Sequence, residues 1–397
     1  MLVRDTSKPR SFELPRQLLT SDPDSILSDP HVAVVVEVMG GERPAADYIR
    51  RALEAGKHVV TANKEVMAKH GPDLLALAHR KGVSLLFEAS VGGGIPIIGP
   101  LMQDLLANQV RSIHAIINGT TNYILTRMAY EGLDFQAALA EAQRLGYAEP
   151  DPTNDVEGID AAYKICILAS LAFHTRVPVE SVYREGITRL RAKDFRYARE
   201  LGYAIKLLAI ASRENGAIQV RVHPVWVPQD HLLAKVDGAF NAIEVEGDLV
   251  GRVVFHGLGA GPLPTSSAVI GDILEVARRL ASGSAPSPVI AIGDGLEVRP
   301  MAQVETRYYI RLNVADKAGV LAQIARILGE NQISIAAVIQ KDADPTAHTA
   351  ELVIMTHPAI EERVQKAIHL VTGLGVVVTV DNLVRVEDWP STGRGQA

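Results

Sequence analysis

Short apolar runs alternate with amphipathic segments in the first part of the chain, between His31 and Phe87. The run HVAVVVEV is continuous and rich in β-branched residues, which is typical of a strand buried on both faces of a parallel sheet. The segment PAADYIRRALEAG that follows has helical spacing, and its Gly56 suits the position just past a helix end. The pattern therefore begins as a strand followed by a helix.

The same alternation continues with a strand at HVV, a helix from about Lys64 to Lys81 and a strand at GVSLLFEA. Strands and helices joined by short connections predict an α/β fold with a doubly wound, Rossmann-like sheet. Ligands of such sheets bind beyond the carboxyl ends of the strands. Three segments lie at those ends: VMGGERP, TANKE and EASVGGGIP.

Between about Pro100 and Ala281 the order of the elements changes. The pattern predicts helices up to Gly202 and a final helix over roughly Ser266 to Leu280. Strand-like runs lie between them: YAIKLLAIAS, AIQVRVHPVWV, AIEVEGD and GRVVFHG. Helices followed by strands indicate an α+β domain with an antiparallel or mixed sheet.

A linker rich in Ser, Pro and Gly, ASGSAPSPVIAIGDG, precedes a compact unit over Tyr308 to Val386. Strand and helix patterns follow there in the order βαββαβ, the ferredoxin-like arrangement. The tail WPSTGRGQA is expected to be disordered. We thus expect four regions: an incomplete doubly wound domain (1–99), an α+β domain (100–284), the linker (285–304) and a βαββαβ domain (305–387).

The chain has 397 residues and a formal net charge of −6. This balance speaks against a nucleic-acid or anionic-membrane partner, because both require a basic face. No run approaches the roughly 18 apolar residues that span a bilayer, and MLVRDTSKPR lacks the apolar stretch of a signal peptide. The single cysteine, Cys166, suits a small core residue in a reducing compartment. We expect a cytoplasmic protein.

The segment GYAEPDPTNDVEGIDAAYK, Gly146 to Lys164, holds five carboxylates and one lysine just ahead of the apolar run ICILASLAF. Helix electrostatics explains part of this charge. Asn154 and Glu157 have the spacing of a capping box. Acids in a first turn also complement the helix dipole, each by roughly 0.3–1 kcal/mol.

Two lysines carry a second interpretation. Asp160 lies four residues before Lys164, which suits an ordinary helical ion pair. The helix after Lys164 is apolar almost all round, however, and a lysine at the core edge beside carboxylates is a candidate proton donor. Lys64 opens a helix after a parallel strand, where cofactors and substrates bind. A solvated surface lysine is the alternative for Lys64.

Glycine-rich turns that could hold a nucleotide are incomplete. No G-x-G-x-x-G occurs between residues 1 and 31. GLGAGP, ending at Pro262, has a proline in place of the third glycine and suits a tight turn better than a dinucleotide fingerprint. VGGGIP, from Val91, suits either contact with an ion or phosphate or a simple turn. DKAGVL suits a small-ligand site or a turn in which Asp316 caps a helix and Gly319 allows close approach.

Six segments, taken in order, resemble the signatures of the homoserine dehydrogenases of the monofunctional bacterial type with a C-terminal ACT domain. The segments are VVVEVMGG, TANKE, EASVGGGIPII, INGTTNYIL, GYAEPDPTNDVEGIDAAYK and GLGAGPLPTSSAV. The resemblance runs from about Val3 to Val386 and implies an oxidoreductase that interconverts L-homoserine and L-aspartate 4-semialdehyde with NADP or NAD. It also implies a place in threonine, methionine and isoleucine biosynthesis, with catalysis in 100–284 and an ACT domain in 305–387.

The resemblance further implies roles for single residues. Lys164 would donate the proton to the aldehyde oxygen, and Asp160 would hold that ammonium or the substrate. Glu149 and Asp155 would bind the α-amino group of the substrate. Physical chemistry agrees, because carboxylates hold an ammonium and a lysine stabilises charge that develops on an aldehyde oxygen. The positions expected near the cofactor are Lys64, Gly40, Gly146, Gly261 and Arg4, the last meeting an NADP 2′-phosphate.

Ion, effector and assembly follow from the same resemblance. A sodium site is implied at main-chain oxygens of Glu88, Val91, Gly93 and Ile95. The ACT domain implies feedback control by an amino acid, with threonine the family's usual effector, near Asp316 and Gly319. A homodimer or homotetramer is expected.

The opening strand, glycine turn and first helix of the family have no counterpart here; such a βαβ unit takes roughly 30 residues. MLVRD resembles the family's second strand, so we expect poor NADP binding, lowered stability and a start codon assigned too far downstream. The alternative function is a truncated, non-catalytic amino-acid-binding regulator. The presence of both Lys64 and Lys164 with the acidic segment favours the dehydrogenase.

Overall fold

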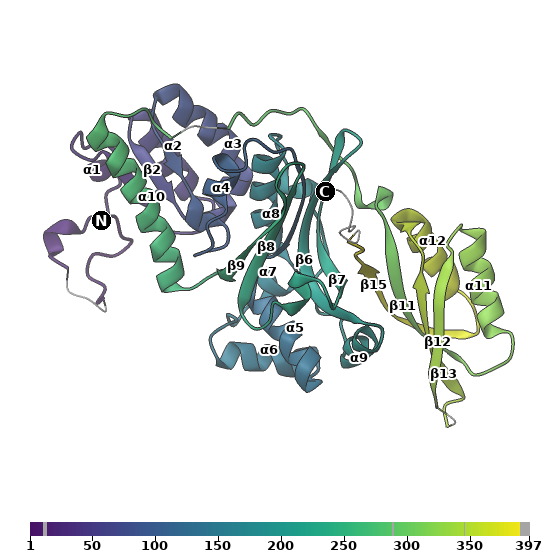
Figure 1. Ribbon diagram of the computed structural model, residues 1–397. Coiled ribbons are helices and arrows are strands. Elements are labelled where there is room, and N and C mark those ends of the chain that lie inside the picture. The colour runs from purple at the N-terminus through teal and green to yellow at the C-terminus, as the bar shows by residue number, and fades with distance from the viewer. Residues whose placement is uncertain (11–13, 288–289, 345, 390–397) are drawn as a thin grey trace. The chain divides into compact units, whose positions relative to one another are not determined.

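The computed structural model describes residues 1–10, 14–287, 290–344 and 346–389. Of the tail predicted to be disordered, Trp389 is described and donates from Nε1 to Glu244 at 3.0 Å, and the remainder lies outside the described residues. The chain forms two compact units, whose helices and strands are labelled in Figure 1. The first unit contains Met1–Val110, Cys166–Val179 and Gly247–Gly295. The second contains Arg111–Ile165, Glu180–Glu246 and the chain from Leu296 onward.

The first unit is built on a parallel sheet with the strand order β1-β2-β3. The main elements are β1 (Val34–Glu37), α2 (Ala45–Glu54), β2 (His58–Thr61), α3 (Lys64–Lys81), β3 (Leu85–Leu86) and α10 (Pro262–Ser282). Shorter elements are η1 (Arg16–Leu18), α1 (Asp24–Leu27), η2 (Glu88–Ser90) and α4 (Ile98–Met102), and β9 (Gly251–Leu258) precedes α10. The predicted alternation is confirmed, and α3 has the predicted bounds. Val276 of α10 packs on Val60 and Leu86 of the sheet.

Strand β1 differs from its prediction. Val36 is 41% exposed and Val38, just after the strand, is 62% exposed, whereas the apolar run predicts burial on both faces. Strand β1 is one of the two edge strands of the three-stranded sheet, and in that sheet it pairs only with β2. Apolar content alone does not reveal which strand lies at an edge.

The second unit has a large sheet with the strand order β12-β13-β11-β15-β7-β6-β4-β8. Its long strands are β4 (Val110–Ile116), β6 (Tyr203–Glu214), β7 (Ala217–Pro228), β8 (Phe240–Gly247), β11 (Glu305–Ala315), β12 (Ile335–Asp344), β13 (Thr349–Thr356) and β15 (Val377–Val386). Two short strands, β5 (Tyr183–Arg184) and β10 (Glu297–Val298), pair with β7, and β14 (Ala359–Ile360) pairs with β11. Strand β4 lies where only helices were predicted, because it forms by pairing with the distant β6.

Helices of the second unit carry the candidate chemistry. They are α5 (Gly119–Glu131), α6 (Phe135–Arg144), α7 (Thr153–Val156), α9 (Ala192–Glu200), α11 (Val320–Glu330) and α12 (Glu361–Thr372). Helix α8 (Ile159–Ala172) begins in the second unit and ends in the first. The 3-10 turns are η3 (Val179–Ser181), η4 (Leu232–Lys235) and η5 (Met301–Gln303).

The C-terminal portion, Glu305–Val386, has the predicted βαββαβ order. Its four long strands are antiparallel in the order β12-β13-β11-β15, and a core that includes Ile310, Ile324 and Val364 joins the sheet to both helices. Strand β15 also pairs in parallel with β7, through Arg385 opposite Val225. The sheet of the C-terminal portion therefore continues directly into the sheet of the preceding domain (Figure 1).

Candidate active site

The start of helix α5 organises the site. Asn118 is the N-cap residue and has an extended backbone, and its Oδ1 accepts hydrogen bonds from the Thr121 N–H at 2.9 Å and the Thr121 hydroxyl at 3.0 Å. A capping asparagine satisfies a backbone donor that the helix itself leaves unpaired. The cap leaves the Asn118 amide nitrogen facing α7 and α8.

That amide nitrogen joins two of the predicted acids. Asn118 Nδ2 donates to Asp155 Oδ1 at 2.7 Å and to Asp160 Oδ2 at 2.9 Å. Both N–H groups are thus used on carboxylates, which makes these hydrogen bonds charge-assisted. Asn118 is only 5% exposed and Asp160 is buried, whereas Asp155 is half-buried. Sequence reasoning missed this residue, although INGTT just before a helix carries the signal of a capping asparagine.

Lys164 completes the cluster. Its Nζ donates to Asp160 Oδ2 at 2.7 Å and to the Ile117 carbonyl oxygen at 2.7 Å. Lys164 is 8% exposed and Asp160 4% exposed, so the predicted i, i+4 ion pair is confirmed and is buried rather than solvated. Such a pair requires both partners, because either charge alone would be desolvated without compensation.

Asp155 has a distinct electrostatic position. Burial raises the pKa of its carboxyl group above the ordinary value, the hydrogen bond from Asn118 opposes that rise, and the nearby charge of Asp160 adds to it. The cluster therefore contains two carboxylates close together and one ammonium bonded to Asp160. A further ammonium beside Asp155 would relieve the repulsion between the carboxylates.

Glu149 and Gly146 lie outside this hydrogen-bonded cluster. Glu149 is exposed, and its carboxylate has no hydrogen bond or ion pair within the described part of the chain. Gly146 has a φ of +79° and turns the chain after α6. The Thr120 hydroxyl donates to the Tyr147 carbonyl at 2.6 Å, which holds this segment beside the start of α5.

The predicted capping box at Asn154 and Glu157 is wrong. Helix α7 contains Asn154 as its second residue, and Pro152 stands at the N-cap without a side-chain cap. Asp151 instead accepts hydrogen bonds from Thr153. The helices α7 and α8 are separate because Gly158 lies between them with a φ of +75°, which is not a helical conformation.

In the first unit, Lys64 is the first residue of α3. The preceding Asn63 caps that helix by accepting from the Val66 N–H at 3.1 Å, and its Nδ2 donates to the Gly41 carbonyl at 2.7 Å. Gly40 and Gly41 have φ values of +75° and +74°, and a side chain at either position would meet open space. The carboxyl end of β1 is thus open, and the exposed Met39 lies beside it.

The two glycine-rich loops of the first unit touch each other. A Cβ atom on Gly93 would lie 2.5 Å from the Gly259 carbonyl oxygen, and Gly93 has a φ of +55°. Gly261 is the N-cap of α10 with a φ of +116°. These glycines serve close backbone approach, which agrees with the tight-turn interpretation of GLGAGP. Arg4 is exposed, two residues after the bridge that Leu2 forms with Thr20.

Glu88 of the proposed sodium loop already has backbone partners. Its carboxylate accepts from the N–H groups of Ile97, Ile98 and Gly99 at 2.6–2.8 Å. Its own N–H donates to Asp272, whose pKa is raised to about 7 by burial. Among the described residues, no group of three or more His, Cys, Asp or Glu side chains could hold a metal ion. This finding does not bear on the predicted main-chain oxygens.

The predicted effector turn differs from a capping turn. Asp316 is exposed, and α11 has Gly319 as its N-cap, with a φ of +88° and no side-chain cap. Asp316 therefore does not cap this helix.

The single cysteine, Cys166, is 1% exposed, as predicted for a core residue. None of the helices in the described ranges is long and apolar enough to cross a membrane.

Comparison with known families gives a consistent match along the chain. The model of the homoserine dehydrogenase NAD-binding domain matches residues 1–88, that of homoserine dehydrogenase matches residues 96–274, and that of the ACT domain matches residues 308–369. Fold, site and matches together define the class: an NAD(P)-dependent oxidoreductase that carries an ACT domain.

Individual relatives narrow the class. A homoserine dehydrogenase from Synechocystis sp. is 44% identical over 393 residues, which cover 97% of this chain and 90% of the relative. The crystal structure of a homoserine dehydrogenase from Thiobacillus denitrificans has a TM-score of 0.88 and 45% identity, and covers 93% of this chain and 85% of that chain. The chain belongs to the homoserine dehydrogenase family.

A more distant structure includes the cofactor. The hyperthermophilic archaeal homoserine dehydrogenase in complex with NADPH has a TM-score of 0.57 and 31% identity, and covers 65% of this chain and 75% of that chain. The family membership confirms the sequence-based identification and does not favour the alternative of a non-catalytic regulator.

Proposed function

We propose that this protein catalyses the NAD(P)-dependent interconversion of L-homoserine and L-aspartate 4-semialdehyde. The observation that carries this proposal is the buried Lys164 ammonium, bonded to Asp160 beside Asp155, in a chain of the homoserine dehydrogenase family. An amino-acid aldehyde has an ammonium that carboxylates hold and a carbonyl oxygen that a lysine protonates.

The proposed residue roles come from the family resemblance, and the geometry supports them. Asp155 and Glu149 hold the α-ammonium of the substrate, and the proximity of Asp160 makes a positive group at Asp155 favourable. Lys164 stabilises the oxygen on which charge develops and gives it a proton, while Asp160 and the Ile117 carbonyl orient the ammonium. Asn118 keeps the two aspartates in place. The nicotinamide supplies or removes the hydride.

The cofactor is assigned to the first unit. The open turn at Gly40, the first turn of α3 with Lys64, and the N-terminus of α10 at Gly261 are the features that would hold the nicotinamide end. The open space beside Gly40 and the exposed Met39 leave the end of β1 accessible to a ligand. Arg4 is the residue proposed to meet a 2′-phosphate, with NADP the preferred cofactor. Gly146 keeps its proposed role as a cofactor-binding residue.

Four further assignments complete the proposal. Main-chain oxygens of Glu88, Val91, Gly93 and Ile95 hold a sodium ion. Residues 1–99 bind the cofactor, 100–284 carry the chemistry, 285–304 are a linker and 305–387 respond to an amino acid. That amino acid is threonine, bound near Asp316 and Gly319, where the exposed αL turn leaves the backbone accessible. The protein is a cytoplasmic homodimer or homotetramer.

Oxidation of NADPH with aspartate semialdehyde tests the reaction. We expect consumption of NADPH to match formation of homoserine, and L-threonine to inhibit it. Absence of turnover would refute the proposed function.

A further inference from the structure

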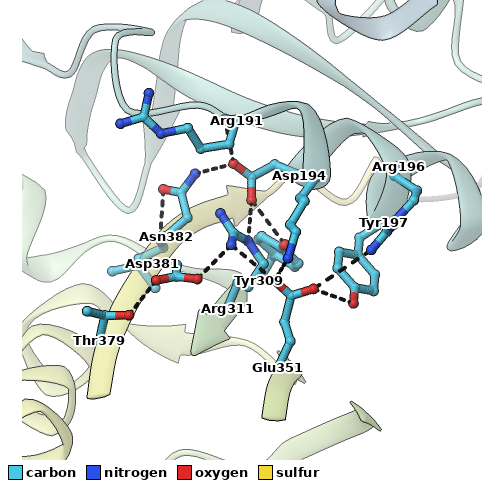
Figure 2. A network of polar contacts seen from close by, with 12 residues as sticks. Arg191, Asp194, Arg196, Tyr197, Tyr309, Arg311, Glu351, Thr379, Asp381 and Asn382 are labelled. Carbon is cyan, nitrogen blue, oxygen red and sulfur yellow. Dashed lines mark hydrogen bonds and ion pairs between the residues drawn. The ribbon is translucent and has the colours of Figure 1, made fainter. Parts of the chain in front are cut away.

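Two clusters of polar contacts join the C-terminal portion to the preceding domain, in addition to a contact between Arg307 and the Tyr203 hydroxyl at 3.3 Å. Figure 2 shows the first: Asp194 of α9 accepts hydrogen bonds from Tyr309, Arg311 and Asn382 of the C-terminal portion. Glu351 of β13 accepts from the Tyr197 hydroxyl of α9 (Figure 2). It also accepts from Lys193 of the same helix at 3.0 Å. These hydrogen bonds hold helix α9 against the C-terminal portion and involve none of the active-site residues.

The second connection starts at Arg385 of β15, whose side chain is 2% exposed. Arg385 pairs with Glu361 of its own portion at 2.6 Å and reaches across to Glu185 at 2.7 Å and to the Tyr183 hydroxyl at 3.1 Å. The Tyr183 hydroxyl also donates to Glu185 at 3.0 Å. Through its ion pair with Arg385, Glu185 therefore connects the loop between α8 and α9 to the C-terminal portion.

The contact between Arg385 and Glu185 lies at the wall of a groove. A groove of about 980 Å³ lies between this loop and α12 with β15, and many of the side chains that line it are polar, among them Glu185 and Arg385. The loop backbone is anchored on β7 through Tyr183, Arg184 and the Glu185 N–H, which donates to the Val222 carbonyl oxygen at 2.8 Å. Beyond Glu185 the chain leaves β7.

The two residues after Glu185, Gly186 and Ile187, contact helix α7 beside Asp155. The Ile187 N–H donates to the Val156 carbonyl oxygen at 2.9 Å. A Cβ atom on Gly186 would lie 2.3 Å from the same oxygen, so the two backbones are in direct contact. Val156 follows Asp155 in the single turn of α7. Any displacement of the turn at Gly186 and Ile187 therefore moves the backbone that carries Asp155.

We infer that Glu185 is a positioning residue for the reaction: held by Arg385 of the C-terminal portion, it fixes the turn at Gly186 and Ile187 that places Asp155. The inference rests on the proposed role of Asp155 in the substrate site. The ACT domain would then help to support the active site, and a movement of that domain would be transmitted to the Asp155 carboxylate.

Four variants test this route. Glu185→Ala removes the contact with Arg385 and leaves Arg385 paired with Glu361. Gly186→Ala places a Cβ atom against the Val156 carbonyl oxygen and changes no contact of the C-terminal portion. Lys193→Ala is the matched control, because it removes an ion pair of the same interface, with Glu351, that leads to α9 only. Glu185→Gln, which keeps an acceptor oxygen for Arg385, is the conservative rescue.

The kinetic readout is the KM for aspartate semialdehyde beside kcat. We expect Glu185→Ala and Gly186→Ala to raise KM about tenfold or more, with a smaller change in kcat, because small misplacements in a site cost rates of this order. Glu185→Gln and Lys193→Ala stay within about threefold of the wild type. Equal effects of Lys193→Ala and Glu185→Ala would overturn the route, since they would show general loosening of the interface.

Amide hydrogen exchange of the peptide over residues 153–158 is the second readout, and it needs no turnover. Exchange there rises in Glu185→Ala and Gly186→Ala but not in Lys193→Ala. Unchanged exchange and kinetics in Glu185→Ala would overturn the inference while leaving the proposed function intact. Increased exchange in a protein whose wild type shows no turnover would refute the proposed reaction and still support the positioning of Asp155.

Discussion

Asn118→Asp is the substitution that separates positioning from helix capping at the active site. Aspartate is as good an N-cap as asparagine, so the hydrogen bond from the Thr121 N–H is kept. The two donations to Asp155 and Asp160, at 2.7 and 2.9 Å, are lost, and a third carboxyl group takes their place. The change therefore alters the electrostatics of the site and leaves the start of α5 intact.

The expected loss in kcat/KM follows from the two hydrogen bonds that Asn118 donates to Asp155 and Asp160. A hydrogen bond to a charged group contributes about 1.5–3 kcal/mol. A factor of ten corresponds to about 1.4 kcal/mol, so loss of one such bond in the transition state lowers kcat/KM about 10- to 100-fold. Repulsion among three carboxylates adds to this loss at pH 8. At lower pH one carboxyl group is protonated, its O–H again donates, and the deficit shrinks.

The assay is the pH dependence of kcat/KM between pH 6 and 9, measured as NADPH oxidation with aspartate semialdehyde. Asn118→Ser is the matched control, because serine caps the helix without adding charge. We expect it to lose activity with a deficit that does not depend on pH. A deficit below about threefold for Asn118→Asp, or one that is equal at pH 6 and pH 9, would refute the positioning role of Asn118.

Three further predictions concern other parts of the chain. Glu149→Gln raises the KM for aspartate semialdehyde about tenfold with little change in kcat, if the exposed Glu149 carboxylate binds the substrate ammonium; an unchanged KM contradicts this role. Gly93→Ala lowers the unfolding temperature, because its Cβ would lie 2.5 Å from the Gly259 carbonyl, whereas Gly82→Ala, also at positive φ but with open space, has a smaller effect; equal effects would contradict the close contact. Burial raises the pKa of Asp272 to about 7, so between about pH 4 and 7 the folded wild type retains a proton that the unfolded chain releases. The free energy of unfolding of the wild type therefore falls as the pH rises over this range, by up to about 1.4 kcal/mol per pH unit. Asp272→Asn lacks this loss and so becomes more stable relative to the wild type as the pH rises. Urea unfolding at pH 5 and pH 8 measures this difference, and a variant without a pH-dependent gain would show that Asp272 has an ordinary pKa.

Local pattern was sufficient for most of the fold. Helix α3 has its predicted bounds because its signals lie within the segment itself: Asn63 caps its start and Gly82, with a φ of +67°, follows its end. The βαββαβ order is likewise set by strand and helix periods. Strand β4 and the exposure of Val36 could not be predicted, because each depends on which distant strand pairs beside it.

The candidate site shows the same division. The spacing of Asp160 and Lys164 predicts their ion pair, but burial and the Ile117 carbonyl contact are properties of the folded chain. The capping box failed because Asn154 and Glu157 have suitable types and spacing, yet Gly158 breaks the helix between α7 and α8. Asn118 was missed because its second partner pair, Asp155 and Asp160, lies far along the sequence.

The central claim is that Lys164 gives the proton to the aldehyde oxygen in an NAD(P)H-dependent reduction. The most direct measurement is kcat for NADPH oxidation with aspartate semialdehyde in the wild type, in Lys164→Met and in the control Lys206→Met. Lys206 is a second buried lysine that pairs with an aspartate, Asp237, away from the Asn118 cluster. The account predicts turnover in the wild type, a loss of about 10²- to 10⁴-fold in Lys164→Met and a near-normal kcat in folded Lys206→Met. Full turnover in Lys164→Met, or none in the wild type, would contradict it.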